Sequence, residues 1–174
     1  MTYVLGISGS LRAASTNTKL MRAALASFGG DTQEGDLRLP LYDGDLEANG
    51  MPVSVQTLAD QIAGARAVVI SGPEYNKSVS GVLKNALDWV SRTNGNPWLD
   101  KPVAIMSAAA GRAGGERTQF ALRHCMVPFR PLILQGPEVL LAKSSDEFNE
   151  DGTLKSDFYQ KTLDDLMAAL RAAT

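Results

Sequence analysis

Short apolar runs alternate along the chain with segments in which apolar residues recur every three or four positions. The apolar runs predict strands at residues 4–7, 67–70 and 103–106, with weaker candidates at 37–39 and 132–134. The periodic segments predict helices at residues 15–28, 55–64, 80–90, 118–126 and 163–170. Because the three strong strands are apolar throughout instead of alternating, we expect a sheet buried on both faces.

Strands separated by helices predict a parallel sheet with right-handed crossovers and helices on both faces. About five strands fit the length, and the strand order 2-1-3-4-5 is the natural arrangement. No repeat, linker or low-complexity segment interrupts the pattern, so residues 1–174 are predicted to form one domain. The acidic stretch 146–151 is expected to be a surface loop before the last helix.

Composition narrows the class of protein. The formal net charge of −2 gives no basic footprint for nucleic acid and no polybasic face for a membrane. No apolar run approaches the roughly 18 residues of a membrane-spanning helix, and residues 3–7 are too short a run for a signal peptide. The single cysteine, Cys125, has no internal disulfide partner. We therefore expect a cytoplasmic protein.

Ligands of such sheets bind beyond the carboxyl ends of the strands, so the loops after the three strong strands form the candidate site. The first, residues 8–17, is rich in hydroxyls and has one cation, Arg12. A helix start favours an anion, and serine hydroxyls with a guanidinium suit phosphate oxygens. The alternative is that Ser15 is only an N-cap and Arg12 is solvated. Without a Walker A motif or a G-x-G-x-x-G fingerprint, the loop favours a mononucleotide phosphate.

The other two loops are suited to a flat ring. Residues 71–78 combine a Gly-Pro turn with Tyr75 and an amide, although on their own they favour a plain surface turn. Residues 107–117 contain small residues that let a ligand approach the backbone, and two arginines that suit the phosphates of an incoming nucleotide. This third loop is equally consistent with a flexible helix start. The fold brings all three strand ends together, so the loops support one another.

Three motifs in these loops resemble the signatures of the NADPH-dependent FMN reductase family, which includes chromate, quinone and azo reductases of bacteria. They are GSLRAASTN (9–17), GPEYNKSVSGVLKNALDW (72–89) and GRAGGERTQFALR (111–123). The resemblance runs in order over nearly the whole chain and extends to FNEDGTL (148–154). It implies a flavodoxin-like three-layer α/β sandwich with a five-stranded parallel sheet in the order 2-1-3-4-5.

The resemblance also implies which residues bind the cofactor. The residues expected to hold the FMN phosphate are Ser10, Arg12, Ser15 and Asn17. Those expected to border the isoalloxazine ring are Pro73, Glu74, Tyr75 and Asn76 on one side and Ala109 and Gly111 on the other. Ser80 stands where the family usually has proline, which we expect to loosen the helix entry, and Ala109 replaces a frequent serine. We expect no catalytic side chain and no metal ligand.

By the same resemblance, the protein is an FMN-dependent NAD(P)H oxidoreductase. Reduced nicotinamide, with NADPH favoured and NADH left open, would deliver hydride to FMN, and a quinone or another small electrophile would then take the electrons. One alternative is a flavodoxin-like electron carrier, although such carriers are usually much more acidic than a net charge of −2. A second alternative is an enzyme that supplies reduced FMN to a partner monooxygenase.

Three further residues invite a functional interpretation. Cys125 shares a helical face with Leu122 and Met126, so we predict a buried and inert thiol. His124 has no neighbouring carboxylate or cysteine cluster in the sequence that would suggest metal ligation. Related enzymes associate through the helix after the second loop, so a homodimer or homotetramer with Trp89 near the contact is expected.

Overall fold

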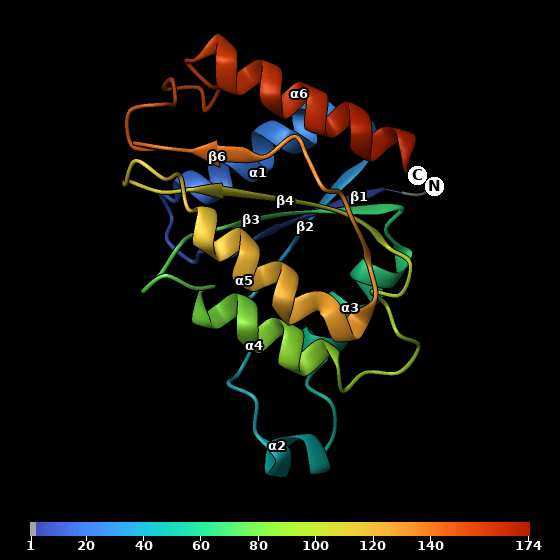
Figure 1. Cartoon of the computed structure of the whole chain (residues 1–174). Coiled ribbons are helices and arrows are strands. Elements are labelled where there is room, and N and C mark those ends of the chain that lie inside the picture. The colour runs from blue at the N-terminus through green and yellow to red at the C-terminus, as the bar shows by residue number, and fades with distance from the viewer. Residues whose placement is uncertain (1–2) are drawn as a thin grey trace.

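A computed structural model describes residues 3–174 and shows a parallel sheet between two layers of helices (Figure 1). The strands are β1 (Val4–Ser8), β2 (Thr32–Gly35), β3 (Ala67–Gly72), β4 (Pro102–Ala108), β5 (Leu132–Ile133) and β6 (Val139–Leu141). The helices are α1 (Thr16–Phe28), α2 (Gly44–Ala48), α3 (Val53–Gly64), α4 (Gly81–Val90), α5 (Glu116–Met126) and α6 (Asp157–Ala172), with a 3-10 turn, η1 (Val127–Phe129), after α5.

The strands are hydrogen-bonded in the order β2-β1-β3-β4-β5, which confirms the predicted order. The sheet has six strands instead of the expected five, because two short strands, β5 and β6, share the position beside β4. β5 pairs with the start of β4 at Pro102 and Val103, whereas β6 pairs with its last three residues. The strand predicted at 37–39 is wrong: the edge strand is the polar segment Thr32–Gly35, which hydrophobicity does not reveal.

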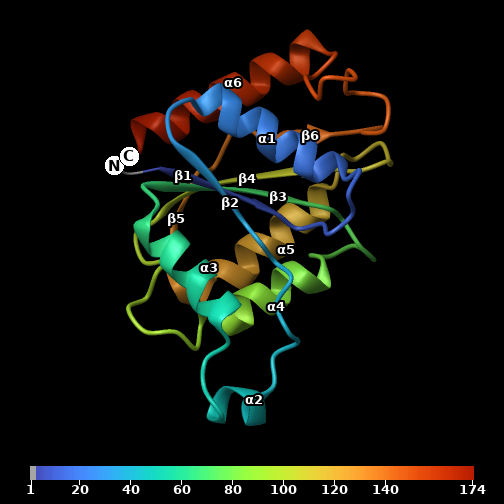
Figure 2. The same ribbon diagram turned by 180° about the vertical axis from the view of Figure 1, so that it is seen from behind.

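Both faces of the sheet are covered. Helices α1 and α6 lie on one face and α3, α4 and α5 on the other (Figures 1 and 2). Along β3, Ala67 and Val69 belong to the first hydrophobic cluster, and Val68 and Ile70 belong to the second. Each fully buried Val or Ile side chain contributes about 1.5–3 kcal/mol. This two-sided core fixes the strands that carry the candidate loops.

A segment of residues 36–52, called the arm below, extends from the body beyond α4 and includes α2 (Figure 2). Asn85 anchors its first half, donating from Nδ2 to the Pro40 carbonyl at 2.9 Å and accepting at Oδ1 from the Tyr42 backbone nitrogen at 2.8 Å. Trp89 donates to the same Pro40 oxygen and packs edge-on against Tyr42. Trp89 is 0% exposed, so the arm of its own chain covers it.

Candidate functional site

The carboxyl ends of β1, β3 and β4 lie side by side, and three loops leave the sheet there (Figure 1). We name them loop 1 (residues 9–15), loop 2 (73–80) and loop 3 (109–115). The base of loop 1 is joined to β3, the strand that leads into loop 2, because the Gly9 backbone nitrogen donates to the Ser71 carbonyl at 2.8 Å. The fold therefore brings together the three segments that the sequence singles out.

Asn17 is a structural tie at the base of these loops. Its Nδ2 donates to the Ala108 carbonyl at 2.9 Å, and its Oδ1 accepts from the Ala108 nitrogen and from Ser71 Oγ, both at 3.0 Å. The residue is 3% exposed. Its amide pairs with one backbone residue as a neighbouring strand would, joining the start of α1 to the ends of β3 and β4. Most of its hydrogen-bonding capacity is thus used within the protein.

Loop 1 leads into a helix start that suits an anion. Ser15 is the N-cap of α1, and its Oγ accepts from the Thr18 nitrogen at 3.3 Å, which leaves the hydroxyl hydrogen available. The first turn of α1 contains no acidic residue to offset the positive end of the helix. Arg12 is exposed and makes no ion pair within residues 3–174, while Ser10 Oγ accepts from its backbone nitrogen. This donor set fits a phosphate group.

Loop 2 forms a tight turn that presents an aromatic ring. Tyr75 and Ser78 exchange two backbone hydrogen bonds of 3.0 Å, and the residues between them, Asn76 and Lys77, have φ of 50° and 66°. Two left-handed residues inside such a pair define a type I′ turn. The Tyr75 side chain is 47% exposed, whereas Pro73 at the loop base is buried. Tyr75 is therefore free to lie against a ligand.

Ser80 joins loop 2 to loop 1. Its hydroxyl donates to the Gly9 carbonyl at 2.6 Å, and the side chain is almost completely buried. Proline could not make this hydrogen bond, so the serine hydroxyl counters the expected loosening of the α4 entry, which itself stays a prediction. A Cβ on Gly9 would lie 3.0 Å from Pro73 Cδ and 3.2 Å from Ser80 Oγ. A side chain at position 9 would therefore force Pro73 or Ser80 to shift by a few tenths of an ångström.

Loop 3 is held at both ends. At its start, the Ala109 nitrogen donates to the Leu141 carbonyl at 3.0 Å and the Ala109 carbonyl accepts from the Ser144 nitrogen at 3.1 Å. Ser107 Oγ donates to the Gly114 carbonyl at 2.7 Å and accepts from Gln119 Nε2 at 3.0 Å. Gly115 has φ of 88°, and a Cβ there would lie 2.9 Å from Ser107 Cβ. By contrast, no atom lies within 4 Å of a Cβ placed on Gly111. The backbone near Gly111 therefore faces open space that a ligand can approach.

The two arginines of the third motif have different surroundings. Arg117 forms an ion pair with Glu74 of loop 2, with Nη1 and Oε1 3.3 Å apart. Arg112 is exposed and makes no ion pair within the described chain. Only Arg112 therefore keeps an uncompensated charge at loop 3.

A hollow of about 410 Å³ lies between loop 1 and the start of α4. Its lining comprises Gly9, Ser10, Leu11, Arg12, Tyr75, Ser80, Gly81 and Val82. Three of the predicted site residues are thus brought to one cavity. Sequence reasoning missed Leu11 as a wall residue and Ser80 as a tie, and the departure of Ser80 from the family's proline was the available signal.

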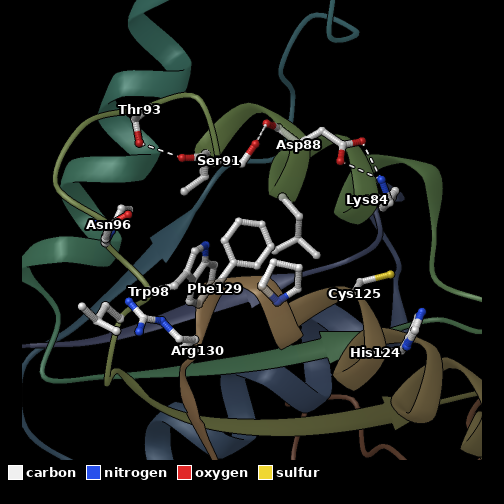
Figure 3. Close-up of a pocket in the computed structure, with 15 residues that line it drawn as sticks. Lys84, Asp88, Ser91, Thr93, Asn96, Trp98, His124, Cys125, Phe129 and Arg130 are labelled. Atoms are coloured by element: carbon white, nitrogen blue, oxygen red, sulfur yellow. Dashed lines mark hydrogen bonds and ion pairs between the residues drawn. The ribbon is translucent and has the colours of Figure 1, made fainter.

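A second cavity, of about 600 Å³, lies between the carboxyl-terminal halves of α4 and α5 and residues 91–99 (Figure 3). Its walls include Trp98, Cys125 and Phe129, and none of the predicted cofactor-binding residues. Cys125 is half-buried at this wall, so its predicted full burial is corrected, and His124 is exposed. The cavity is separate from the three loops.

Within residues 3–174, no three or more His, Cys, Asp or Glu residues are grouped as metal ligands would be. Over the same described part of the chain, no helix has the length and apolar character needed to cross a membrane. The three loops remain the candidate site.

A doubly wound sheet with a helix start prepared for phosphate and two loops flanking an open space defines a mononucleotide-binding protein of α/β class. The chain belongs to the NADPH-dependent FMN reductase family, whose model matches residues 2–146. Membership confirms the expected flavodoxin-like fold, the enzyme class of oxidoreductase and FMN as the cofactor.

Relatives of known activity cover most of the chain. An NAD(P)H-dependent FMN reductase of Pseudomonas aeruginosa is 39% identical over 171 residues, covering 97% of this chain and 92% of the relative. A quinone reductase of Escherichia coli is 40% identical over 142 residues, covering 79% and 76%. The structure of the flavoenzyme NAD(P)H:acceptor oxidoreductase FerB from Paracoccus denitrificans has a TM-score of 0.87 at 30% identity, covering 99% of both chains.

Proposed function

We propose that this enzyme takes hydride from NAD(P)H onto FMN and passes the electrons to a quinone or another small electrophile. The observation that carries the proposal is the meeting of loops 1 and 2 at an open hollow. Loop 3 leaves the neighbouring strand end, and the helix start after loop 1 has no acidic residue to offset its positive end. The quinone reductases among the relatives support a quinone as the acceptor.

The chain's own residues bind and orient the cofactor. We assign the phosphate to Ser10, Arg12 and Ser15, together with the free backbone N–H groups of the first turn of α1. We assign the edges of the ring to Pro73, Tyr75 and Asn76 on one side, and to Ala109 and Gly111 on the other. When bound, FMN supplies the ring that accepts hydride, so no side chain need act as an acid or base in that half-reaction.

In this proposal, two of the predicted cofactor-binding residues hold the loops in place through their side chains. Asn17 ties α1 to β3 and β4, and Glu74 caps α5. Each holds a loop in place, while the neighbouring residues meet the cofactor.

The cofactor and the first half-reaction are tested together. The purified protein should carry flavin, and chromatography of the heat-released cofactor should identify FMN. Under argon, NADPH should bleach the flavin absorbance, and an added quinone should restore it. FAD as the only tightly bound flavin, or a flavin that neither NADPH nor NADH bleaches, would overturn the proposal.

The same preparation separates the proposal from its alternatives. An electron carrier would hold FMN but would not sustain NADPH oxidation with a quinone in the steady state. An enzyme that supplies reduced FMN to a monooxygenase would lose its flavin during gel filtration. Retention of FMN together with steady-state turnover therefore favours the quinone reductase.

We propose that the chain acts as a single domain over residues 1–174, in the cytoplasm, as a homodimer or homotetramer. Two exposed apolar side chains support an association surface at the arm: Leu41 within it, 81% exposed, and Val53 directly after it at the start of α3, 82% exposed. Because Trp89 is buried under the arm, we assign the contact to the arm itself. Light scattering at micromolar concentration should give a multiple of 18.5 kDa, and a monomer would refute this assignment.

A further inference from the structure

Glu74 of loop 2 makes its side-chain contacts with the first turn of α5. Its Oε2 accepts a hydrogen bond from the Arg117 backbone nitrogen at 3.2 Å, and its Oε1 lies 3.3 Å from Nη1 of the same residue. The side chain is 15% exposed, the lowest value for a carboxylate in any ion pair of residues 3–174. Of these carboxylates, Glu74 is therefore the best shielded from water.

Helix α5 begins without a capping side chain of its own. The N-cap position is Gly115, with φ of 88°, and it makes no side-chain cap hydrogen bond. A carboxylate at a helix start satisfies a free N–H group and interacts favourably with the helix dipole. Glu74 supplies this cap from a different loop. It thereby fixes loop 2 against the helix that directly follows loop 3.

The two segments that Glu74 joins are those assigned to opposite edges of the flavin ring. Loop 3 is already held at its far end by the Ser107–Gly114 hydrogen bond. Its other end is held as well, because the Ala109 nitrogen donates to the Leu141 carbonyl at 3.0 Å and the Ala109 carbonyl accepts from the Ser144 nitrogen at 3.1 Å. Loop 3 is thus fixed by contacts of its own, and the Glu74–Arg117 contact fixes loop 2 relative to the start of α5, which directly follows loop 3.

We propose that Glu74 is a positioning residue that acts through Arg117 to set the separation of loops 2 and 3, and so the fit of the flavin ring. The inference rests on the proposed function and deepens it. Glu74 then governs affinity for the ring portion, not for the phosphate. It also governs turnover, because the two loops would orient the bound ring, and a displacement of about 1 Å can cost on the order of 100-fold in rate.

The test uses FMN and riboflavin, which share the ring and differ in the phosphate. Glu74→Ala should weaken both flavins by the same factor, about 3- to 10-fold for one partly exposed charge-assisted contact, leaving the ratio of the two Kd values unchanged. Glu74→Gln keeps an acceptor for the backbone N–H and should lose less. Arg117→Ala removes only the guanidinium and should also lose less.

Coupling between the two residues gives a second readout. The double variant Glu74→Ala/Arg117→Ala should bind both flavins as Glu74→Ala does, since the contact is already lost in the single variant. At saturating FMN, Glu74→Ala should lower kcat, and Glu74→Gln should recover part of it. A merely structural role would lower Tm and leave kcat at saturating FMN unchanged, which would overturn the inference.

The matched control is Asp165→Asn, which breaks the exposed Lys161–Asp165 pair on α6, on the other face of the sheet. It should leave both Kd values and kcat at wild-type levels. Wild-type affinities in Glu74→Ala, a loss confined to FMN, or additive losses in the double variant would overturn the inference while leaving the proposed function intact. A wild-type protein that binds no flavin would overturn both.

Discussion

Two asparagine side chains form the hydrogen bonds to backbone groups that a neighbouring strand normally forms. Asn17 pairs with both backbone groups of Ala108, and Asn85 pairs with the Pro40 carbonyl and the Tyr42 nitrogen. A primary amide has a donor and an acceptor side by side, so it can complete a backbone pair where the sheet does not extend. One asparagine closes the base of the candidate site, and the other holds the arm.

Asn17→Ala should destabilise the protein strongly. It removes partners from two buried backbone groups of Ala108 and from the Ser71 hydroxyl. Each unsatisfied buried group costs about 1–3 kcal/mol, so with three groups affected we expect a loss of at least about 3 kcal/mol in the free energy of unfolding, measured with urea. Asn149→Ala is the control, because Asn149 makes an exposed local contact with Thr153. Asn149→Ala should lower the free energy of unfolding by well under about 1 kcal/mol. Equal losses in the two variants would contradict the structural role of Asn17.

Arg12→Ala should weaken FMN binding without changing the hydride step. One charge-assisted hydrogen bond contributes about 1.5–3 kcal/mol, so the Kd for FMN should rise roughly 10- to 150-fold. At saturating FMN, kcat should change little, because the phosphate is remote from the ring. Riboflavin should bind wild-type protein much less tightly than FMN, and the substitution should barely alter its Kd. Equal weakening of both flavins would show that Arg12 acts through loop structure.

At the residue scale, the sequence indicates chemical type better than it indicates partners. Ser15 was recognisable as an N-cap because its acceptor role is local, three residues along the chain. The family resemblance places Asn17 at the phosphate, whereas its contact with Ala108, 91 positions away, becomes visible only through the fold. The contact of Glu74 is equally hidden in the sequence, because its partner Arg117 lies 43 positions away.

Among the elements, burial decided what the sequence could predict. β1, β3 and β4 are almost fully buried, so uninterrupted apolar runs revealed them. β2 has only one strand neighbour and reads TQEG, and α2 buries none of its residues. Neither carries a hydrophobic pattern, so the edge strand was misplaced and the short helix was missed.

The type I′ turn of loop 2 offers a test of backbone strain. Lys77 has φ of 66°, a region that costs ordinary residues about 1–2 kcal/mol and glycine little. Glycine relieves this strain but loses more conformational entropy on folding. The relief of strain is the larger effect, so Lys77→Gly should raise the free energy of unfolding by a net amount of about 0.5–1 kcal/mol. Ser78→Gly in the same turn, where φ is not positive, should lower stability. A destabilised Lys77→Gly measured by urea unfolding would contradict the expected relief.

For the molecule as a whole, strand order and family could be predicted, but the division of the fifth strand could not. The order follows from alternating buried strands and helices, and the motifs after those strands indicated the family. The break separates Ile133 from Val139, and both short strands lie on one edge of β4. Two- and three-residue strands are too short for a periodic pattern to register.

The placement of the three loops at the ends of β1, β3 and β4 has a kinetic consequence for the refolding chain. These strands span residues 4–108, and the site forms only when all three have aligned. Helices form in about a microsecond, whereas non-local parallel pairing is much slower. In stopped-flow refolding, far-ultraviolet ellipticity should therefore appear before quenching of added FMN fluorescence. The cofactor would thus report the last step of sheet assembly, and by mass action it would stabilise only chains that have completed that step.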